Sequence, residues 1–314
     1  AGTGLDSGNM TLRVFPHGRP EWVRGLVFNT RRPLFQDRRV RQALTMVLDF
    51  SWLNRTLFHN AYVRTASYYP NSELAATGLP TGREREILET YRKNLPPEIF
   101  TEPFTMPVTD GSGPAALRPW LRQARILLAN AGWHMQNGQL VNEQGEPFRF
   151  GILLVNPSDE PVALEFVRGL KRLGIEATIR TVDTAQYQGR IDESDFDMTV
   201  NKWLSTLSPG NEQITFWGSD YTALPGSRNY PGIRDGVVDA LARSISAAAT
   251  RGELVATVRA LDRVLLWGYY IVPLYHAPGD RIAWWKPLRH PDTTPIYGPV
   301  LDSWWIQEHG AKNQ

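Results

Sequence analysis

The segment from Gly25 to Phe58 constrains the fold more than any other part of the chain. An extended apolar run leads through a basic turn into a helix that starts after Asp37, a good N-cap because its carboxylate accepts from free backbone N–H groups. Apolar side chains then recur at helical spacing, at Val40, Ala43, Leu44, Val47 and Leu48. We therefore expect a strand followed by a buried helix, which together join two substructures.

Length and composition indicate an ordinary globular protein with one large domain or two. The chain has 314 residues, 42% of them hydrophobic and 21% charged, and a formal net charge of +2. Such a small charge does not favour nucleic acid or an anionic membrane as a partner. No apolar run approaches the roughly 18 residues of a membrane span. No signal peptide is recognisable, so we expect any export signal to be absent from this chain.

The sequence lacks the usual patterns of catalytic and metal sites. The absence of cysteine excludes disulfides, thiol nucleophiles and Cys-ligated zinc. The six histidines are dispersed, with no HExxH motif and no pair at i, i+4 spacing. There is no GxSxG motif, no GxxxxGK(S/T) motif, and no GxGxxG motif after a strand. We therefore expect no catalytic residues, no metal site and no cofactor.

The alternation of elements predicts an α/β fold with a mixed sheet. A strand at 148–155, a helix at 161–173 and a strand at 175–182 form an expected βαβ unit with a right-handed crossover. A short helix then leads to a strand at 196–203. Further along the chain we expect a hairpin turn at Asn137-Gly138, helices at 115–130, 235–248 and 251–267, and strands at 11–15, 26–29, 269–275 and 282–285.

Several stretches resemble family 5 extracellular solute-binding proteins of ABC importers, which capture oligopeptides, nickel and related solutes. The resemblance rests on FNTRRPLFQDRRVRQAL at 28–44, TEPFTMPVTDGSG at 101–113, LKRLGIEATIRTVDTAQYQGRI at 170–191, FDMTVNKWLSTLSPGNEQ at 196–213 and RALDRVLLWGYYIVPLYH at 259–276. Together these stretches are similar to the YejA-like branch of the family, which is associated with uptake of peptide-nucleotide antibiotics of the microcin C type.

The resemblance implies a type II periplasmic-binding-protein fold, of which this chain matches roughly the C-terminal half. Residues 1–33 would be the end of lobe I and the crossover, residues 34–267 lobe II, and residues 268–314 the return to lobe I and a tail. The strands at 26–29 and 269–275 would then belong to a first lobe that the chain lacks. We expect residues 269–274 to be an exposed pairing edge, and the chain to self-associate or to stay bound to the N-terminal lobe.

The same resemblance implies that the solute lies between the lobes, near the loop after the strand at 196–203. The expected ligand contacts in this region are Asn201, Lys202, Trp203, Ser205, Ser208 and Asn211. Arg228, Asn229 and Tyr230 form a second group, suited to a carboxylate or phosphate, and Tyr69 offers a ring for stacking. Structural roles are the alternatives: a buried aromatic for Trp203, a surface ion pair for Arg228, and a loop anchor for Tyr69. Arg31 and Arg32 could be hinge or cleft residues, but the preferred expectation is that they pair with Asp37 or with acids of lobe I.

The preferred hypothesis is a periplasmic substrate-binding component of an ABC importer. It would close on a peptide or peptide conjugate and deliver it, chemically unchanged, to an inner-membrane ABC permease. One alternative is a hydrolase that acts on peptides or glycans through an aromatic-lined groove. A third hypothesis is a structural interaction domain with an aromatic surface patch.

Overall fold

A five-stranded mixed sheet forms the centre of the structure, a computed structural model that describes residues 3–113 and 115–307. Its strands are β2 (Val23–Phe28), β6 (Arg149–Leu154), β7 (Glu176–Thr181), β8 (Met198–Trp203) and β9 (Ile271–Pro273). Their order in the sheet is β7-β6-β8-β2-β9. β6 is parallel to β7 and β8, whereas β2 is antiparallel to β8 and β9. The expected mixed α/β sheet is therefore confirmed.

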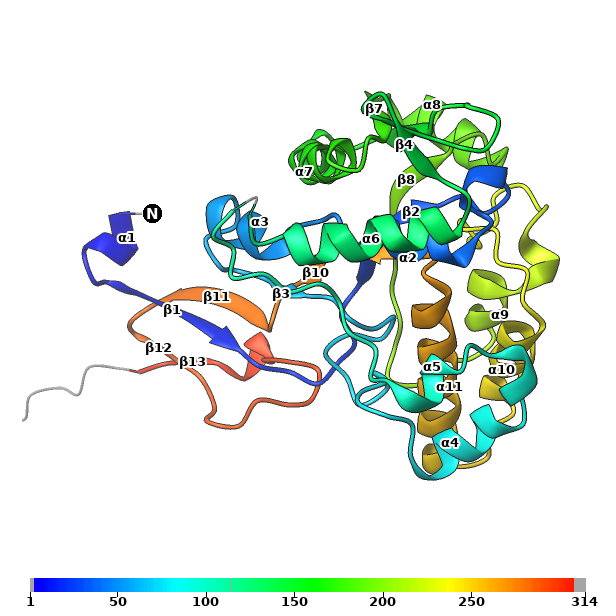
Figure 1. Cartoon of the computed structure of the whole chain (residues 1–314). Helices are drawn as coiled ribbons and strands as arrows, with labels where there is room; N and C mark the ends of the chain where they lie inside the picture. The colour runs from blue at the N-terminus through cyan, green and yellow to red at the C-terminus, as the bar shows by residue number, and fades with distance from the viewer. Residues whose placement is uncertain (1–2, 114, 308–314) are drawn as a thin grey trace, which may run out of the picture.

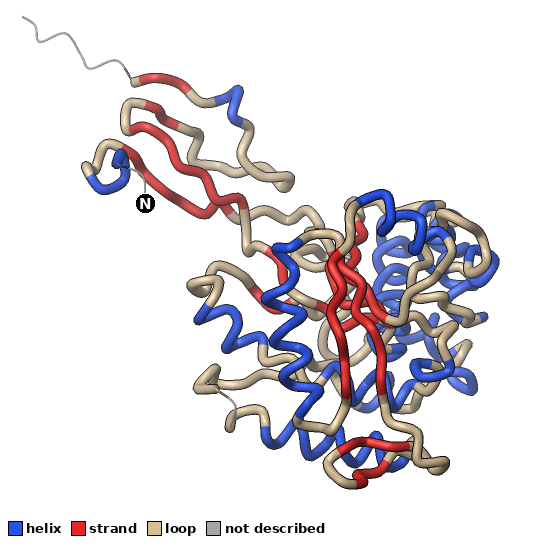
Figure 2. Tube along the Cα trace, turned by 90° about the horizontal axis from the view of Figure 1, so that it is seen from above, coloured by secondary structure: helices blue, strands red, loops and turns tan. Residues whose placement is uncertain are grey.

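Helices lie on both faces of this sheet (Figures 1 and 2). The described helices are α1 (Thr3–Asp6), α2 (Arg38–Thr45), α3 (Phe50–Thr56), α4 (Gly82–Glu89), α5 (Glu98–Thr101), α6 (Arg118–Asn130), α7 (Glu160–Lys171), α8 (Thr184–Asp192), α9 (Glu212–Trp217), α10 (Gly236–Ser246) and α11 (Arg251–Gly268). Short 3-10 turns occur at Pro33–Phe35, Arg92–Asn94, Pro157–Asp159, Ser219–Tyr221 and Leu301–Ser303.

The alternation of side chains along β2 divides the core into two layers. Leu26 and Phe28 point into a cluster with α2, α6 and α7, and Val23 and Val27 point into a cluster with α9, α10 and α11. Neighbouring residues of a strand face opposite sides of the sheet, so an almost wholly apolar strand is what a central strand with two covered faces requires. This explains why the run at 23–28 is buried along nearly its whole length.

The helix expected after Asp37 is two helices in the structure. Asp37 caps α2 as expected, accepting from the backbone N–H of Arg39 at 2.8 Å, but α2 ends at Thr45. Asp49 then caps α3, accepting from the N–H of Trp52 at 3.0 Å. Val47 lies between the two helices and is still fully buried. The apolar spacing therefore predicted the burial correctly and the continuity of the helix wrongly.

The expected domain boundaries lie outside the strands, 33/34 in the 3-10 turn Pro33–Phe35 and 267/268 at the end of α11, but the central sheet joins strands from all three expected segments. β2 pairs with β8 from Val23–Trp203 to Phe28–Met198, and β9 pairs with the other edge of β2. The sheet thus crosses the expected borders at 33/34 and 267/268. β9 is buried, so the expectation of an exposed edge at 269–274 is wrong. The assignment of segments to lobes of a longer protein stays a prediction.

Four smaller strand pairs complete the structure. They are β3 (Val63–Arg64) with β10 (Tyr275–His276), β4 (His134–Gln136) with β5 (Gln139–Val141), β1 (Met10–Phe15) with β11 (Asp280–Trp285), and β12 (Leu288–Arg289) with β13 (Trp305–Ile306). The β4–β5 hairpin turns at Asn137-Gly138, where both residues have positive φ, as the sequence predicted.

Residues 3–15 and 280–307 form a terminal extension that projects from the main body (Figures 1 and 2). On one face of its β1–β11 pair, Phe15 and Trp284 contact His290 and Trp304, with ring centroids 5.0–5.8 Å apart. The opposite face carries Leu12, Val14 and Trp285, which are 41%, 45% and 59% exposed. We call this second surface the open face of the extension. This face also carries Arg281, and its Leu12 and Val14 line a cavity of about 460 Å³ together with residues 59–62.

Candidate functional site

A cavity of about 480 Å³ lies where the carboxyl ends of β6 and β8 meet the beginning of β2. Ligands bind at this edge in open α/β sheets, because the loops that follow the parallel strands diverge there. Its lining comes from six places in the chain: Glu21, Trp22 and Arg24; Tyr62; Val155, Asn156, Ser158 and Asp159; Tyr187; Val200, Asn201 and Lys202; and Tyr275, His276 and Ala277.

Charged groups of both signs line this cavity. The Arg24 guanidinium of β2 forms an ion pair with the buried Asp159 carboxylate, just before α7. Glu21 lies within 3.1 Å of His17 Nε2. The ammonium of Lys202 lies 4.4 Å from the centroid of the Trp22 ring, a cation–π arrangement. A zwitterionic or dipolar ligand would therefore find both positive and negative partners here.

Aromatic rings form much of the apolar lining. Trp22, which immediately precedes β2, is 40% exposed. Tyr62 and Tyr275 have ring centroids 4.6 Å apart and come from segments joined by the β3–β10 pair. Tyr187 donates from its hydroxyl to the carbonyl of Val200 at 3.0 Å, and burial raises the pKa of this phenol. Such rings supply a large contact area with one polar atom each.

His276 contributes a neutral ring at pH 7. Burial, and secondarily the nearby His17, lowers the pKa of His276 below its ordinary value of 6.5. Its Nδ1 lies 3.0 Å from the hydroxyl oxygen of Thr65. Thr65 is fully buried, so this hydroxyl is not presented to a ligand. The described groups are thus arranged for hydrogen bonding, ion pairing and stacking.

Two of the expected ligand contacts, Asn201 and Lys202, line this cavity. Three others are buried. Trp203 is 1% exposed, its indole N–H donates to the carbonyl of Arg228 at 3.0 Å, and its ring lies 4.9 Å from that of Trp217. Asn229 is 0% exposed, donates to the carbonyls of Gly218 and Ile233, and accepts from the N–H of Ile233. Tyr69 is 1% exposed and donates to Gln213 at 2.6 Å. The structure gives these three side chains structural roles.

The other expected contacts lie apart from the cavity lining. Ser205, Ser208 and Asn211 are in the partly exposed loop that follows β8. The guanidinium of Arg228 lies over the Phe216 ring at 4.6 Å, and Tyr230 packs 5.3 Å from Trp203. The group formed by Arg228, Asn229 and Tyr230 therefore does not converge on one point.

Sequence reasoning missed most of the remaining lining. Asn156 and Asp159 could have been found, because they directly follow the expected strand at 148–155 and the rule applied to β8 applies equally to β6. Trp22 and Tyr62 had no comparable local signal. Their positions depend on the pairing of β2 with β8 and of β3 with β10, which join segments far apart in the chain.

Within residues 3–113 and 115–307, no group of three or more His, Asp or Glu side chains is arranged to hold a metal ion. No helix in these ranges is long and apolar enough to cross a bilayer.

Comparison with known proteins identifies relatives that match nearly the whole of this chain. A putative binding protein of Brucella suis is 43% identical over 302 residues, which are 96% of this chain and 49% of the relative. The probable peptide-binding protein YejA of Agrobacterium fabrum is 41% identical over 290 residues, covering 92% of this chain and 47% of that protein. The chain thus spans about half the length of these relatives, and the expected similarity to YejA-like proteins is confirmed.

The fold is also that of a solved binding protein. The oligopeptide-binding protein AppA of Bacillus subtilis, solved with a nonapeptide, superimposes with a TM-score of 0.67 at 19% identity, over 97% of this chain and 54% of AppA. The expected periplasmic-binding-protein fold of type II is confirmed. The model of bacterial extracellular solute-binding proteins, family 5 middle region, matches residues 6–223. The chain therefore belongs to the family 5 extracellular solute-binding proteins.

Proposed function

We propose that this chain is part of the periplasmic receptor of an ABC importer and binds a peptide or peptide conjugate in the cavity beside Asn201 and Lys202. The observation that carries the proposal is the cavity at the carboxyl edge of β6 and β8, lined by both charge signs and several aromatic rings. A peptide offers matching groups: charged ends or side chains, a polar backbone and apolar surfaces.

The ligand would be held without chemical change. Arg24 and Asp159 already neutralise each other, and Glu21 lies 3.6 Å from the Arg19 guanidinium, which leaves Lys202 as the charged lining group for a ligand to meet. Trp22 and the Tyr62–Tyr275 pair provide surfaces for side chains. Delivery to an inner-membrane permease would follow closure of a second lobe, driven by contacts made only in the closed state.

We further propose that the open face of the extension docks onto the rest of a longer protein. The chain spans about half of its relatives, and Leu12, Val14 and Trp285 are exposed apolar side chains on one face of paired strands. Exposed apolar surfaces of this kind mark interaction sites. The N-terminal lobe of the same receptor is the expected partner.

The test is retention of peptide from a defined pool. The chain is incubated with synthetic tri- to decapeptides, separated rapidly by gel filtration, and analysed by mass spectrometry. We expect a subset of peptides to be retained intact, and less of that subset with Trp22→Ala. Cleaved products would favour the hydrolase alternative, and no retained peptide would contradict the proposal.

A further inference from the structure

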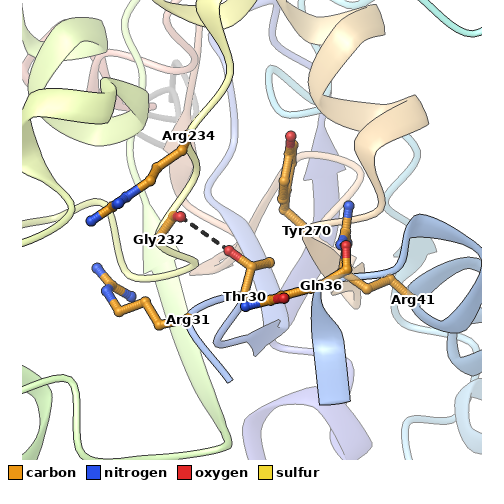
Figure 3. Close-up of a pocket in the computed structure, with 7 residues that line it drawn as sticks. All are labelled: Thr30, Arg31, Gln36, Arg41, Gly232, Arg234 and Tyr270. Atoms are coloured by element: carbon orange, nitrogen blue, oxygen red, sulfur yellow. Dashed lines mark hydrogen bonds between the residues drawn. The ribbon is translucent and has the colours of Figure 1, made fainter. Parts of the chain in front are cut away.

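A second cavity, of about 380 Å³, lies at the opposite end of strand β2. Figure 3 shows the residues that line it. It forms where β2 ends and β9 begins, whereas the candidate site lies where β2 begins. Its lining consists of Thr30, Arg31, Gln36, Arg41, Gly232, Arg234 and Tyr270. Three of these seven residues are arginines, and none carries a carboxylate.

The positive charge of this cavity has no carboxylate partner among the described residues. Arg31, Arg41 and Arg234 form no ion pair there, whereas Arg32, the next residue along, pairs with Asp195 and Asp197 at 3.2 Å each. Asp37 is therefore not the partner of Arg31 or Arg32, and the alternative pairing with acids of lobe I stays a prediction.

The two acids nearest in sequence to the cavity form no ion pair with its arginines, although Asp37 acts electrostatically on Arg41 and Asp235 on Tyr270. Asp37 caps α2 and pairs with Arg39 at 2.6 Å. Asp235 caps α10 and accepts from the N–H groups of Val237 and Val238.

The guanidinium of Arg31 is held in place, because its N–H groups already donate to acceptors of the protein. It donates to the carbonyls of Thr222, Asn229 and Tyr230 and to the side chain of Asn29, at 2.7–3.1 Å. Gly232 lies against it with a φ of +74°, and a Cβ there would come within 2.6 Å of the guanidinium. Burial, and secondarily the charge of Arg234, lowers the pKa of Arg31 to about 10. A bound anion would favour the charged guanidinium and so oppose this lowering of the pKa.

Donors that remain available lie on opposite sides of the cavity. On one side, Arg234 is exposed and uses only its Nε, which donates to Thr222 Oγ1 at 3.1 Å. On the other side lie Gln36 and Tyr270 (Figure 3). Arg41, beside them, is buried and donates to the carbonyls of Phe35, Gln36 and Gly268 at 2.7–3.0 Å, so it contributes mainly charge. Arg41 lies 5.0 Å from the Tyr270 ring centroid. Burial raises the pKa of Tyr270 to about 12, so its hydroxyl keeps its proton and can donate.

We propose that this cavity binds a phosphate group, either as inorganic phosphate or as a soluble phosphate monoester. Guanidinium groups are the preferred partners of phosphate because they combine charge with several N–H donors. One guanidinium group can satisfy a planar carboxylate by donating two parallel hydrogen bonds from one side. A tetrahedral dianion accepts from several directions, which matches donors on two sides of the cavity.

The test is calorimetric titration of the chain with inorganic phosphate and, separately, with phenyl phosphate, at an ionic strength held constant with sodium chloride. We expect saturable binding of at least one of them at one site per chain, and weaker binding of acetate. Arg234→Gln should lower the affinity about tenfold or more, the effect of losing charge-assisted hydrogen bonds. Arg234→Lys should recover part of it.

Arg243→Gln is the matched control, because Arg243 is an exposed arginine of α10 whose partner is Asp220. It should bind phosphate like the unmodified chain. Thermal unfolding without phosphate verifies that each variant is folded, which is expected because Arg234 is exposed. The proposal is overturned if the unmodified chain shows no saturable binding, if Arg234→Gln binds equally well, or if acetate binds as tightly as phosphate.

Discussion

Arg24 and Asp159 form an ion pair that joins the central strand β2 to the turn before α7, beside the candidate site. The two residues are 135 positions apart in the chain. Asp159 is nearly buried, and a quarter of the Arg24 side chain is exposed. The pair therefore fixes the position of the loop after β6 against β2, and with it one wall of the cavity.

Asp159→Asn should lower the free energy of unfolding by about 2 kcal/mol at pH 7. Loss of one partner leaves the other charge partly buried, and the effect should fall below the roughly 3–5 kcal/mol of fully buried pairs because Arg24 is partly solvated. Urea unfolding measures the change. Asp220→Asn, which breaks an exposed pair with Arg243, should change stability by no more than about 0.5 kcal/mol. Equal effects of the two substitutions would contradict this interpretation.

Two tryptophans should respond in opposite ways to truncation. Trp203→Ala should lower the free energy of unfolding by roughly 3–5 kcal/mol, because it leaves a large cavity in the core. Trp22→Ala removes a 40% exposed ring and should change stability by less than about 1 kcal/mol, while it weakens ligand binding. Chemical denaturation of both variants tests the assignment. A stable Trp203→Ala variant with impaired peptide binding would restore Trp203 as a ligand contact.

Asp262 should make stability depend on pH. Its carboxylate is fully buried and accepts from Ser67 Oγ, Tyr68 N and Ala76 N at 2.6–2.8 Å. Burial raises the pKa of Asp262 from 3.8 to about 6, against the opposing effect of these bonds. Between pH 4 and 6 the folded state thus holds a proton that the unfolded state has lost. The contribution of Asp262 to stability therefore rises as pH falls through this window.

Comparison with Asp262→Asn isolates this contribution. The free energy of unfolding of the unmodified chain minus that of the variant should increase as pH falls from 6 to 4, by up to about 3 kcal/mol. Denaturant unfolding at four pH values in that range measures it. If this quantity instead decreases toward pH 4, the hydrogen bonds outweigh burial and the folded pKa of Asp262 lies below 3.8.

The open face of the extension should cause self-association when nothing covers it. We expect the average mass from sedimentation equilibrium to rise with concentration, because apolar strand surfaces pair with each other. Trp285→Lys should shift the chain toward monomer. Leu224→Lys, at an exposed leucine of the main body, should leave the association unchanged. A monomer at all concentrations would contradict the prediction.

Local patterns in the sequence predicted much of the fold. The βαβ unit of β6, α7 and β7 was predicted because each element has its own periodicity and its own stop, such as Gly174 after α7. The break between α2 and α3 was missed, since apolar spacing continues through Val47 and only the cap formed by Asp49 reveals it. The central position of β2 depends on contacts with β8 and β9, which no local pattern encodes.

The site was predicted only in part, for a similar reason. Lys202 and Trp203 are neighbours on β8 and therefore point to opposite faces, so one lines the cavity and the other enters the core. The sequence alone does not show which of the two lines the cavity and which is buried, because both residue types are common at the end of a strand. The contributions of Trp22, Tyr62 and Tyr275 depend on strand pairing between distant segments.

The most direct test of the central claim is the affinity of one retained peptide for matched tryptophan variants, measured by isothermal titration calorimetry. Trp22 lines the cavity, whereas Trp305 is 51% exposed on the terminal extension. We predict saturable binding to the unmodified chain and to Trp305→Ala with equal affinity, and about tenfold weaker binding to Trp22→Ala, as expected for loss of an aromatic contact. Equal affinities for all three proteins, or no saturable binding to any of them, would contradict the account.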